Sequence, residues 1–144
     1  MATFILGKDA KIYQGTAGGA LGTLTEMSNV KDVTLSLESG EADVTTRANQ
    51  GWRAKAATLK EGSVEFEMQW DTADAGFTAI RTAYFNNTAI GLRILDGEDG
   101  EGLEADFSIT QFSRKEPLEE AISVSVTAKV TYSTTPPTWK TANT

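Results

Sequence analysis

Two pairs of carboxylates are the first residues in this sequence that could carry out acid–base chemistry. Glu65 and Glu67 stand two positions apart, as do Glu104 and Asp106, each pair within a stretch where apolar and polar residues alternate. Residues i and i+2 of a strand share a face and lie roughly 6 to 7 Å apart, a separation compatible with glycoside hydrolysis. The same spacing is common on solvated strand faces, and nothing in the sequence marks these carboxylates as desolvated. We therefore expect no catalysis from them.

An acidic segment at residues 96–102 could collect oxygen ligands for a calcium ion. It contains Asp96, Glu98, Asp99 and Glu101 between glycines, without a basic residue among them. The spacing is not that of an EF-hand, and a solvated hairpin end accounts for the same composition. We expect a solvated turn here.

Other kinds of chemistry are excluded by the residue types that the chain lacks. It contains no cysteine and no histidine, which removes disulfides, thiolate nucleophiles, imidazole bases and the usual ligands of zinc, haem and copper. The glycine-rich segment at residues 15–22 is not followed by the Gly-Lys-Ser/Thr of a phosphate-binding loop. We expect a protein that is not an enzyme and that binds no cofactor or metal.

Length and charge limit the remaining classes. The 144 residues suit one domain, and 13 basic against 20 acidic residues give a net charge of −7. Such a chain is a poor candidate for gripping a nucleic-acid backbone or an anionic membrane. No apolar run is long enough for a signal peptide or a membrane span, so the sequence predicts a protein made and kept in a cytoplasm.

The positions of apolar residues predict a mainly β domain with one helix. Alternation with a period of two predicts strands with one buried and one solvated face. After Trp70, either Asp71 or Thr72 is expected to cap a helix over about residues 72–86, whose apolar stripe lies on the dry face of the sheet. The clearest strands are expected at residues 33–38, 63–70, 103–110 and 121–132, and shorter ones at 3–6, 10–14, 42–47 and 90–95.

Two tryptophans stand in segments that read as a loop and a tail. The connection at residues 47–62 is long for a compact domain and carries Trp52, and the segment at 134–144 follows the domain at 1–133 as an extended arm that carries Trp139. Each tryptophan could tuck back onto its own domain or anchor a neighbouring subunit. Aromatic residues with polar surroundings are typical of interface cores, which favours the second interpretation.

The order of these elements resembles the major tail tube proteins of tailed bacteriophages. The resemblance covers nearly the whole chain and is best in the stretch from Leu59 to Trp70 before the helix and in the Pro117-Leu-Glu-Glu approach to the long last strand. It implies a small antiparallel sandwich or partial barrel with one flanking helix. It also implies rings of six subunits, stacked into the hollow tube through which the genome leaves the capsid. The protein would then reside in the virion tail after assembly in the bacterial cytoplasm.

The number of strands that one chain can supply agrees with a channel built from several subunits. A closed sheet needs roughly 16 to 18 strands before it encloses water, more than one chain of this length supplies. Several copies side by side would supply them, and head-to-tail pairing around a ring would cover the exposed edge strands.

The resemblance implies that the long loop and both terminal arms, including residues 1–7, bridge subunits and successive rings. The other expected partners are the tape measure and tail terminator proteins and the double-stranded DNA that passes through without specific binding, and no membrane is expected. The candidate contact residues are Phe4, Ile5, Leu6, Arg47, Gln50, Trp52, Arg53, Pro136 and Trp139.

The net negative charge of the chain suggests how DNA would pass through the tube. If the solvated face with Glu65, Glu67, Glu104 and Asp106 includes the lumen wall, its negative charge would repel phosphates, so that DNA slides. Two alternatives remain: a tube subunit of a type VI secretion or other contractile injection machine, and a carbohydrate-binding module that uses its three tryptophans. Against the second, Trp70 is expected in the core.

Overall fold

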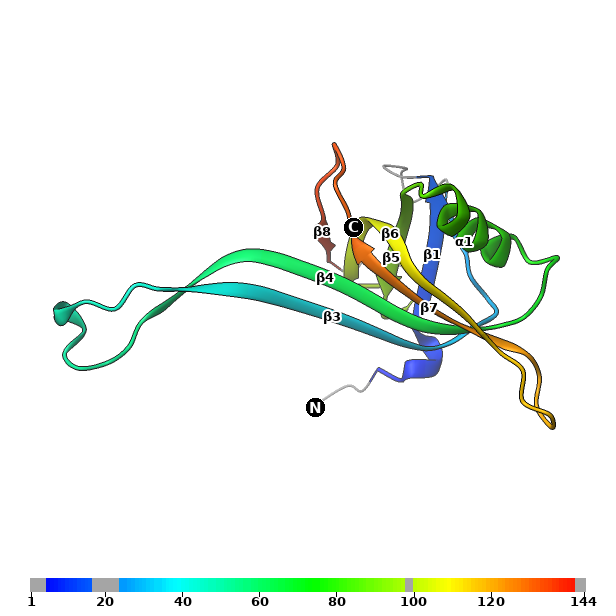
Figure 1. Ribbon diagram of the computed structural model, residues 1–144, viewed down its shortest axis with the longest axis horizontal. Coiled ribbons are helices and arrows are strands. Elements are labelled where there is room, and N and C mark those ends of the chain that lie inside the picture. Colours follow the sequence, from blue (N-terminus) through cyan, green and yellow to red (C-terminus); the bar gives the residue numbers. More distant parts are fainter. Residues whose placement is uncertain (1–4, 17–23, 98–99, 142–144) are drawn as a thin grey trace.

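The computed structural model describes residues 5–16, 24–97 and 100–141. Within these ranges the chain forms one sheet of eight strands, one α-helix and two short 3-10 helices (Figure 1). In chain order they are η1 (Gly7–Asp9), β1 (Lys11–Thr16), β2 (Thr25–Glu26), β3 (Val30–Asp43), η3 (Arg47–Asn49), β4 (Lys55–Gln69), α1 (Ala75–Asn86), β5 (Ile90–Leu95), β6 (Gly102–Lys115), β7 (Ser123–Val130) and β8 (Thr138–Lys140).

The sheet is antiparallel and open. Its strand order is β2-β1-β5-β6-β7-β4-β3, with β8 added beside β6. Strand β6 joins the two halves, because its residues 102–107 pair with β5 and its residues 107–115 pair with β7. The prediction of a mainly antiparallel β fold with one flanking helix is confirmed, and so is the alternation in β4 and, from Val124 to Val130, in β7. In β6 the predicted inward residues are buried, but Asp106 on the other face is buried too.

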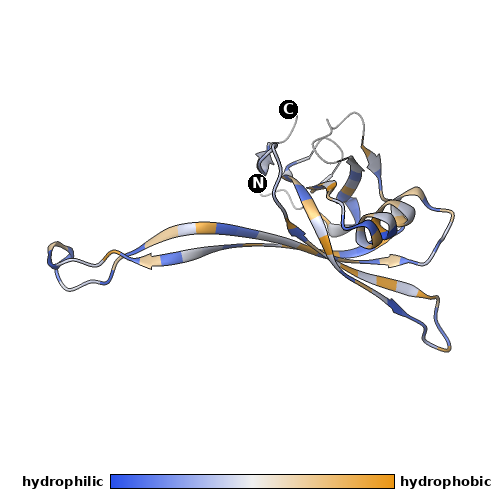
Figure 2. Ribbon diagram, turned by 45° about the horizontal axis from the view of Figure 1, so that its top comes forward, coloured by the Kyte–Doolittle hydropathy of each residue, from blue (hydrophilic) through white to orange (hydrophobic). Residues whose placement is uncertain are grey.

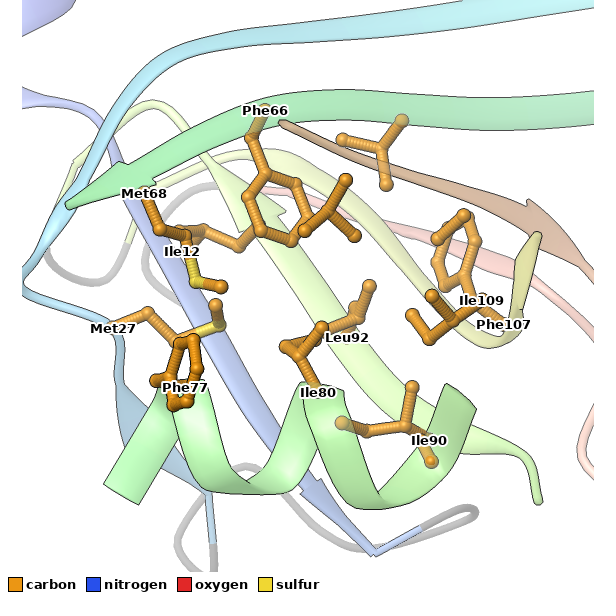
Figure 3. Close-up of a cluster of buried hydrophobic side chains, with 14 of the residues drawn as sticks. Ile12, Met27, Phe66, Met68, Phe77, Ile80, Ile90, Leu92, Phe107 and Ile109 are labelled. Atoms are coloured by element: carbon orange, nitrogen blue, oxygen red, sulfur yellow. The ribbon is translucent and has the colours of Figure 1, made fainter. Parts of the chain in front are cut away.

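The hydrophobic core lies between the helix and one face of the sheet (Figure 3). Phe77 and Ile80 from α1 are fully buried against side chains of the central strands, as the predicted stripe requires. On β4 and β7 the buried residues stand directly opposite one another, because Val64 pairs with Ala128 and Phe66 with Val126. Since an apolar residue at every second position places all of them on one face, this half of the core follows from the sequence pattern.

The helix begins three residues later than predicted. Asp74 is its N-cap, with a carboxylate oxygen that accepts the Phe77 N–H at 2.9 Å. The predicted cap at Asp71 or Thr72 is wrong, because the Asp71 carboxylate instead accepts the Ala73 N–H in the preceding turn. The helix ends at Asn86, and its C-cap, Asn87, adopts the left-handed conformation that favours asparagine and glycine.

Strands β3 and β4 continue far beyond the sheet as a two-stranded ribbon, here called the arm (Figure 1). Strand β4 pairs with β7 only from Ser63 to Gln69, and from Lys55 to Gly62 its pairing partner is β3 alone. The predicted loop at 47–62 is therefore wrong in its second half, which is strand. The predicted strand at 42–47 is also wrong beyond Asp43, where β3 ends.

The chain ends differ from the expected extended segments. In the described part of the predicted strand at 3–6, Ile5 and Leu6 precede η1 without strand pairing, and Phe4 lies outside the described residues. The C-terminal segment turns back after β7, and β8 pairs with the first residues of β6. As far as residue 141, the predicted extended C-terminal arm therefore packs on its own sheet.

Candidate assembly surfaces

The arm tip is an ordered turn without a hydrophobic core beneath it. Gln50 and Gly51 both have positive φ, 52° and 87°, which reverses the chain after η3. The Thr45 hydroxyl fastens the two sides of the tip, since its oxygen accepts the Ala54 N–H at 2.8 Å and it donates to the Ala54 carbonyl at 3.3 Å. The tip is thus shaped in advance of any contact, which lowers the ordering cost of binding.

Asp43 closes the same turn from the β3 side. Its carboxylate accepts the Thr45 N–H at 2.9 Å. Hydrogen bonding from Thr45, through its side chain first and its backbone second, lowers the pKa of the Asp43 carboxyl from 3.8. The charged form of Asp43 is therefore the one that the tip holds at neutral pH.

The arm tip presents an aromatic residue between positive charges. Trp52 is 78% exposed, and Arg47, Gln50 and Arg53 are exposed beside it. Tryptophan and arginine dominate the binding energy of many protein interfaces. The structure thus brings four of the predicted contact residues together at one projecting point, whereas Ile5, Leu6, Pro136 and Trp139 lie on the body of the molecule.

The second tryptophan is held by its own domain. The Trp139 ring N–H donates to a Glu101 carboxylate oxygen at 2.6 Å. The neighbouring Lys140 ammonium is buried and donates to the Gly100 carbonyl at 2.9 Å. Trp139 remains 53% exposed and Pro136 is exposed, so both still present a surface.

The four predicted lumen acids do not share one solvated surface. Glu65 is exposed and Glu67 half-buried, on the face of β4 away from the core. Asp106, by contrast, is buried and accepts a hydrogen bond from the Ser133 hydroxyl, while Glu104 pairs with Arg93 at 2.6 Å. The prediction of a solvated position is wrong for Asp106, because the returning C-terminal segment covers it, whereas Glu104 is half-buried like Glu67.

Two acids that the prediction missed extend the solvated face of β4 along the arm. Glu61 has the same strand parity as Glu65 and Glu67, and it pairs across the arm with Glu38. Both residues are exposed. The register of β3 against β4 places them together, and a single sequence does not reveal that register.

The other candidate sites gain no support. No group of three acidic residues able to hold a metal ion occurs in the described ranges, and residues 98–99 of the acidic segment lie outside them. An Asp96 carboxylate oxygen accepts the Glu101 N–H at 2.9 Å and so closes the turn. Within the described residues, no helix is long and apolar enough to cross a membrane.

Trp70 lies on the core side, as predicted. It is half-buried, packs against Phe77 with ring centroids 4.8 Å apart, and has the Arg114 guanidinium 5.0 Å above its ring. A sugar platform needs an open aromatic face, and this one is covered. The geometry therefore disfavours the carbohydrate-binding alternative.

The free sheet edges complete the set of surfaces. Among the described strands, β3 lies at one end of the sheet and β2, which pairs with β1, lies at the other. A long exposed edge strand is a template for pairing with another chain.

A comparison with protein families matches residues 5–134 to the phage tail tube protein family. The chain belongs to this family. The subunit is thus a structural component of a phage tail tube, and its place is the virion tail. Comparison with curated proteins found no match.

Solved structures share the fold of this tail tube subunit. A chain in the tail of an empty gene transfer agent particle, determined with C6 symmetry, has 19% sequence identity to this chain. The two structures superpose with a TM-score of 0.73, and the match covers 89% of this chain and 95% of that one. The chain of the SPP1 tail tube also has 19% sequence identity, with a TM-score of 0.68, and the match covers 88% of this chain and 75% of that one. The baseplate of the anti-feeding prophage contains a chain with 6% identity and a TM-score of 0.64 over 100% of both.

Proposed function

We propose that copies of this tail tube subunit join side by side into rings of six and that the rings stack into a tube. The observation that carries the proposal is the arm, a two-stranded ribbon that buries almost nothing of itself. An isolated hairpin is marginally stable in water, so its exposed tip gains most from a neighbouring copy. The sixfold number is supported by the C6 symmetry of the gene transfer agent tail.

The arm is the proposed bridge between copies. Trp52 supplies the apolar anchor, Arg47 and Arg53 supply charge, and Gln50 supplies hydrogen bonds at the rim. The edge strands β3 and β2 are the proposed lateral contacts within a ring, because pairing them would extend the sheet around the ring.

The proposed lumen wall is the solvated face of β4 and the arm. Glu38, Glu61, Glu65 and Glu67 lie on this face, and their charge would repel the phosphates of a passing duplex. Double-stranded DNA is thus a passenger, and the tape measure and tail terminator proteins are the proposed partners at the tube ends. Assembly takes place in the host cytoplasm, and no catalytic step is involved.

Electron microscopy of the purified chain at rising concentration tests the proposal. Rings and then tubes are expected. Trp52→Ala removes the anchor and should raise the concentration needed for assembly about 30-fold, as loss of about 2 kcal/mol from an interface hot spot would. Leu59→Ala is the matched control, because Leu59 is 84% exposed on the same arm but away from the tip. A chain that stays monomeric throughout contradicts the proposal.

A further inference from the structure

An apolar groove lies between the base of the arm and the C-terminal segment. Its volume is about 400 Å³. Val130 and Leu37 pack closely over Gly62, since a Cβ atom on Gly62 would lie 2.9 Å from Val130 Cγ2 and 3.2 Å from Leu37 Cδ2. The apolar residues that line it are Leu37, Leu103, Val130, Pro137 and Trp139.

Lys60 is the cationic residue among those that line this groove. Lys60 and Gly62 have the same strand parity on β4, so the Lys60 side chain stands on the groove side of the arm. Glu38 and Glu61 also border the groove, but by the same alternation their side chains stand on the opposite face. Among the ion pairs of the described residues, none involves Lys60.

The β6–β7 turn at residues 116–122 has the complementary composition. Leu118 at its apex is 99% exposed, and the Glu120 N–H donates to the Pro117 carbonyl at 3.5 Å to close the turn. Glu116 pairs with Arg114 at 3.4 Å, whereas Glu119 and Glu120 take part in none of the ion pairs between described residues. An apolar side chain is thus presented with two acidic neighbours.

We infer that the β6–β7 turn of one copy inserts Leu118 into the arm-base groove of a second copy, with Glu119 and Glu120 beside Lys60. This contact rests on the proposed self-assembly and adds a second point of engagement to the arm tip. The turn cannot enter its own groove, because Val130 borders the groove and the turn begins beyond Ser123, about 23 Å away at about 3.3 Å per residue of β7.

The contact joins two different surfaces of the same chain. The turn and the arm project in opposite directions from the body (Figures 1 and 2). A contact of this head-to-tail kind repeats from copy to copy and closes into a ring or continues as a filament. The arm tip is the competing occupant of the groove, but it would bring Arg47 and Arg53 toward Lys60, and like charges disfavour that choice.

Cross-linking tests the contact directly, because the chain has no cysteine of its own. Leu118→Cys and Leu37→Cys are introduced into separate batches of protein, which are mixed, assembled and treated with a short bismaleimide. A linked dimer of the two variants is expected. The matched control replaces the second batch with Leu59→Cys, which lies on the same arm but away from the groove lining, and little linkage is expected there.

The outcomes separate this contact from the proposed tube. Tubes whose Leu118→Cys subunits link to Leu37→Cys no more than to Leu59→Cys overturn the contact and leave the tube intact. If Trp52→Cys links to Leu37→Cys and Leu118→Cys does not, the arm tip occupies the groove, and the proposed contact is overturned as well. If the unmodified chain forms no tubes at all, the proposed function fails and the contact with it.

A charge exchange keeps the test decisive if a cysteine variant does not fold. Lys60→Glu should raise the concentration needed for assembly about tenfold, and adding Glu119→Lys and Glu120→Lys in the same chain should restore most of the loss. Failure of this restoration, with all variants folded by circular dichroism, overturns the proposed pairing.

Discussion

Asp43 ties the chemistry of a single carboxyl to the shape of the arm tip. Because Thr45 lowers its pKa, the charged form stabilises the folded tip. This contribution is complete above the unfolded pKa and is lost as the pH falls through the lower folded pKa. Carbon NMR of the Asp43 carboxyl should therefore give a pKa below 3.8, and the difference in stability between Asp43→Ala and the unmodified chain should disappear in strong acid. A midpoint at or above 3.8 contradicts the proposed turn.

Ser133 is the residue through which the C-terminal segment holds a buried carboxylate. Its hydroxyl donates to Asp106, which is 5% exposed, and accepts the Thr135 N–H at 3.0 Å. Ser133→Ala should lower the free energy of unfolding by about 1 kcal/mol, as the loss of a hydrogen bond to a buried group does. Thr134→Ala, at an exposed neighbour, is the control and should change little. Equal unfolding midpoints in urea for the two variants would contradict this role.

The core residues of β4, β6 and β7 could be predicted from the sequence, but the burial of Asp106 and the exposure of Val33 and Leu37 on β3 could not. Alternation identifies the two faces of a strand, so Phe66, Phe107 and Val126 were correctly expected inside. Whether the opposite face meets water depends on segments far away in the chain. Asp106 has the parity of a solvated residue and is buried because the segment after β7 returns over it.

The arm is the element whose extent the sequence did not reveal. A period of two arises when one strand face is dry, and both faces of the arm are exposed from Leu37 outward to its tip. Without a dry face, Lys55 to Gly62 lacks the pattern that marks a strand and resembles a loop. Arg47, Gln50, Trp52 and Arg53 lie close together in the sequence, so their grouping at the tip needs no knowledge of the strand register.

Repulsion across the arm gives a prediction about its stability. Glu38 and Glu61 stand directly opposite each other, and like charges in that position destabilise a strand pair. Glu61→Lys would replace repulsion with attraction and should raise the free energy of unfolding of the monomer by about 0.2 to 1 kcal/mol. Glu61→Gln, which only removes the repulsion, should give a smaller gain. If urea denaturation shows Glu61→Lys to be no more stable than Glu61→Gln, the pairing does not have the proposed effect.

The molecule as a whole has surfaces that are incomplete in a single copy. Its described sheet ends in the edge strands β2 and β3, its arm has no core, and its groove and turn carry Lys60 and two glutamates, whose charges are opposite. One helix covers one face of the sheet, and the opposite face of β4 remains solvated and acidic. A ring uses these features together, since lateral pairing covers the edges and leaves one face of each sheet toward a common axis.

The acidic face leads to a prediction about the assembled tube. Glu65→Lys with Glu67→Lys would place two cations per subunit on the proposed lumen wall, so tubes should retain double-stranded DNA at low salt and release it as the salt concentration rises. Particles built from this variant should eject their genome more slowly. Asp9→Lys with Asp71→Lys changes the net charge equally on exposed residues outside β4 and the arm and should leave ejection unchanged. Equal DNA retention by the two variants, measured by cosedimentation with the tubes, would mean that net charge alone governs passage and that this face of β4 does not line the channel.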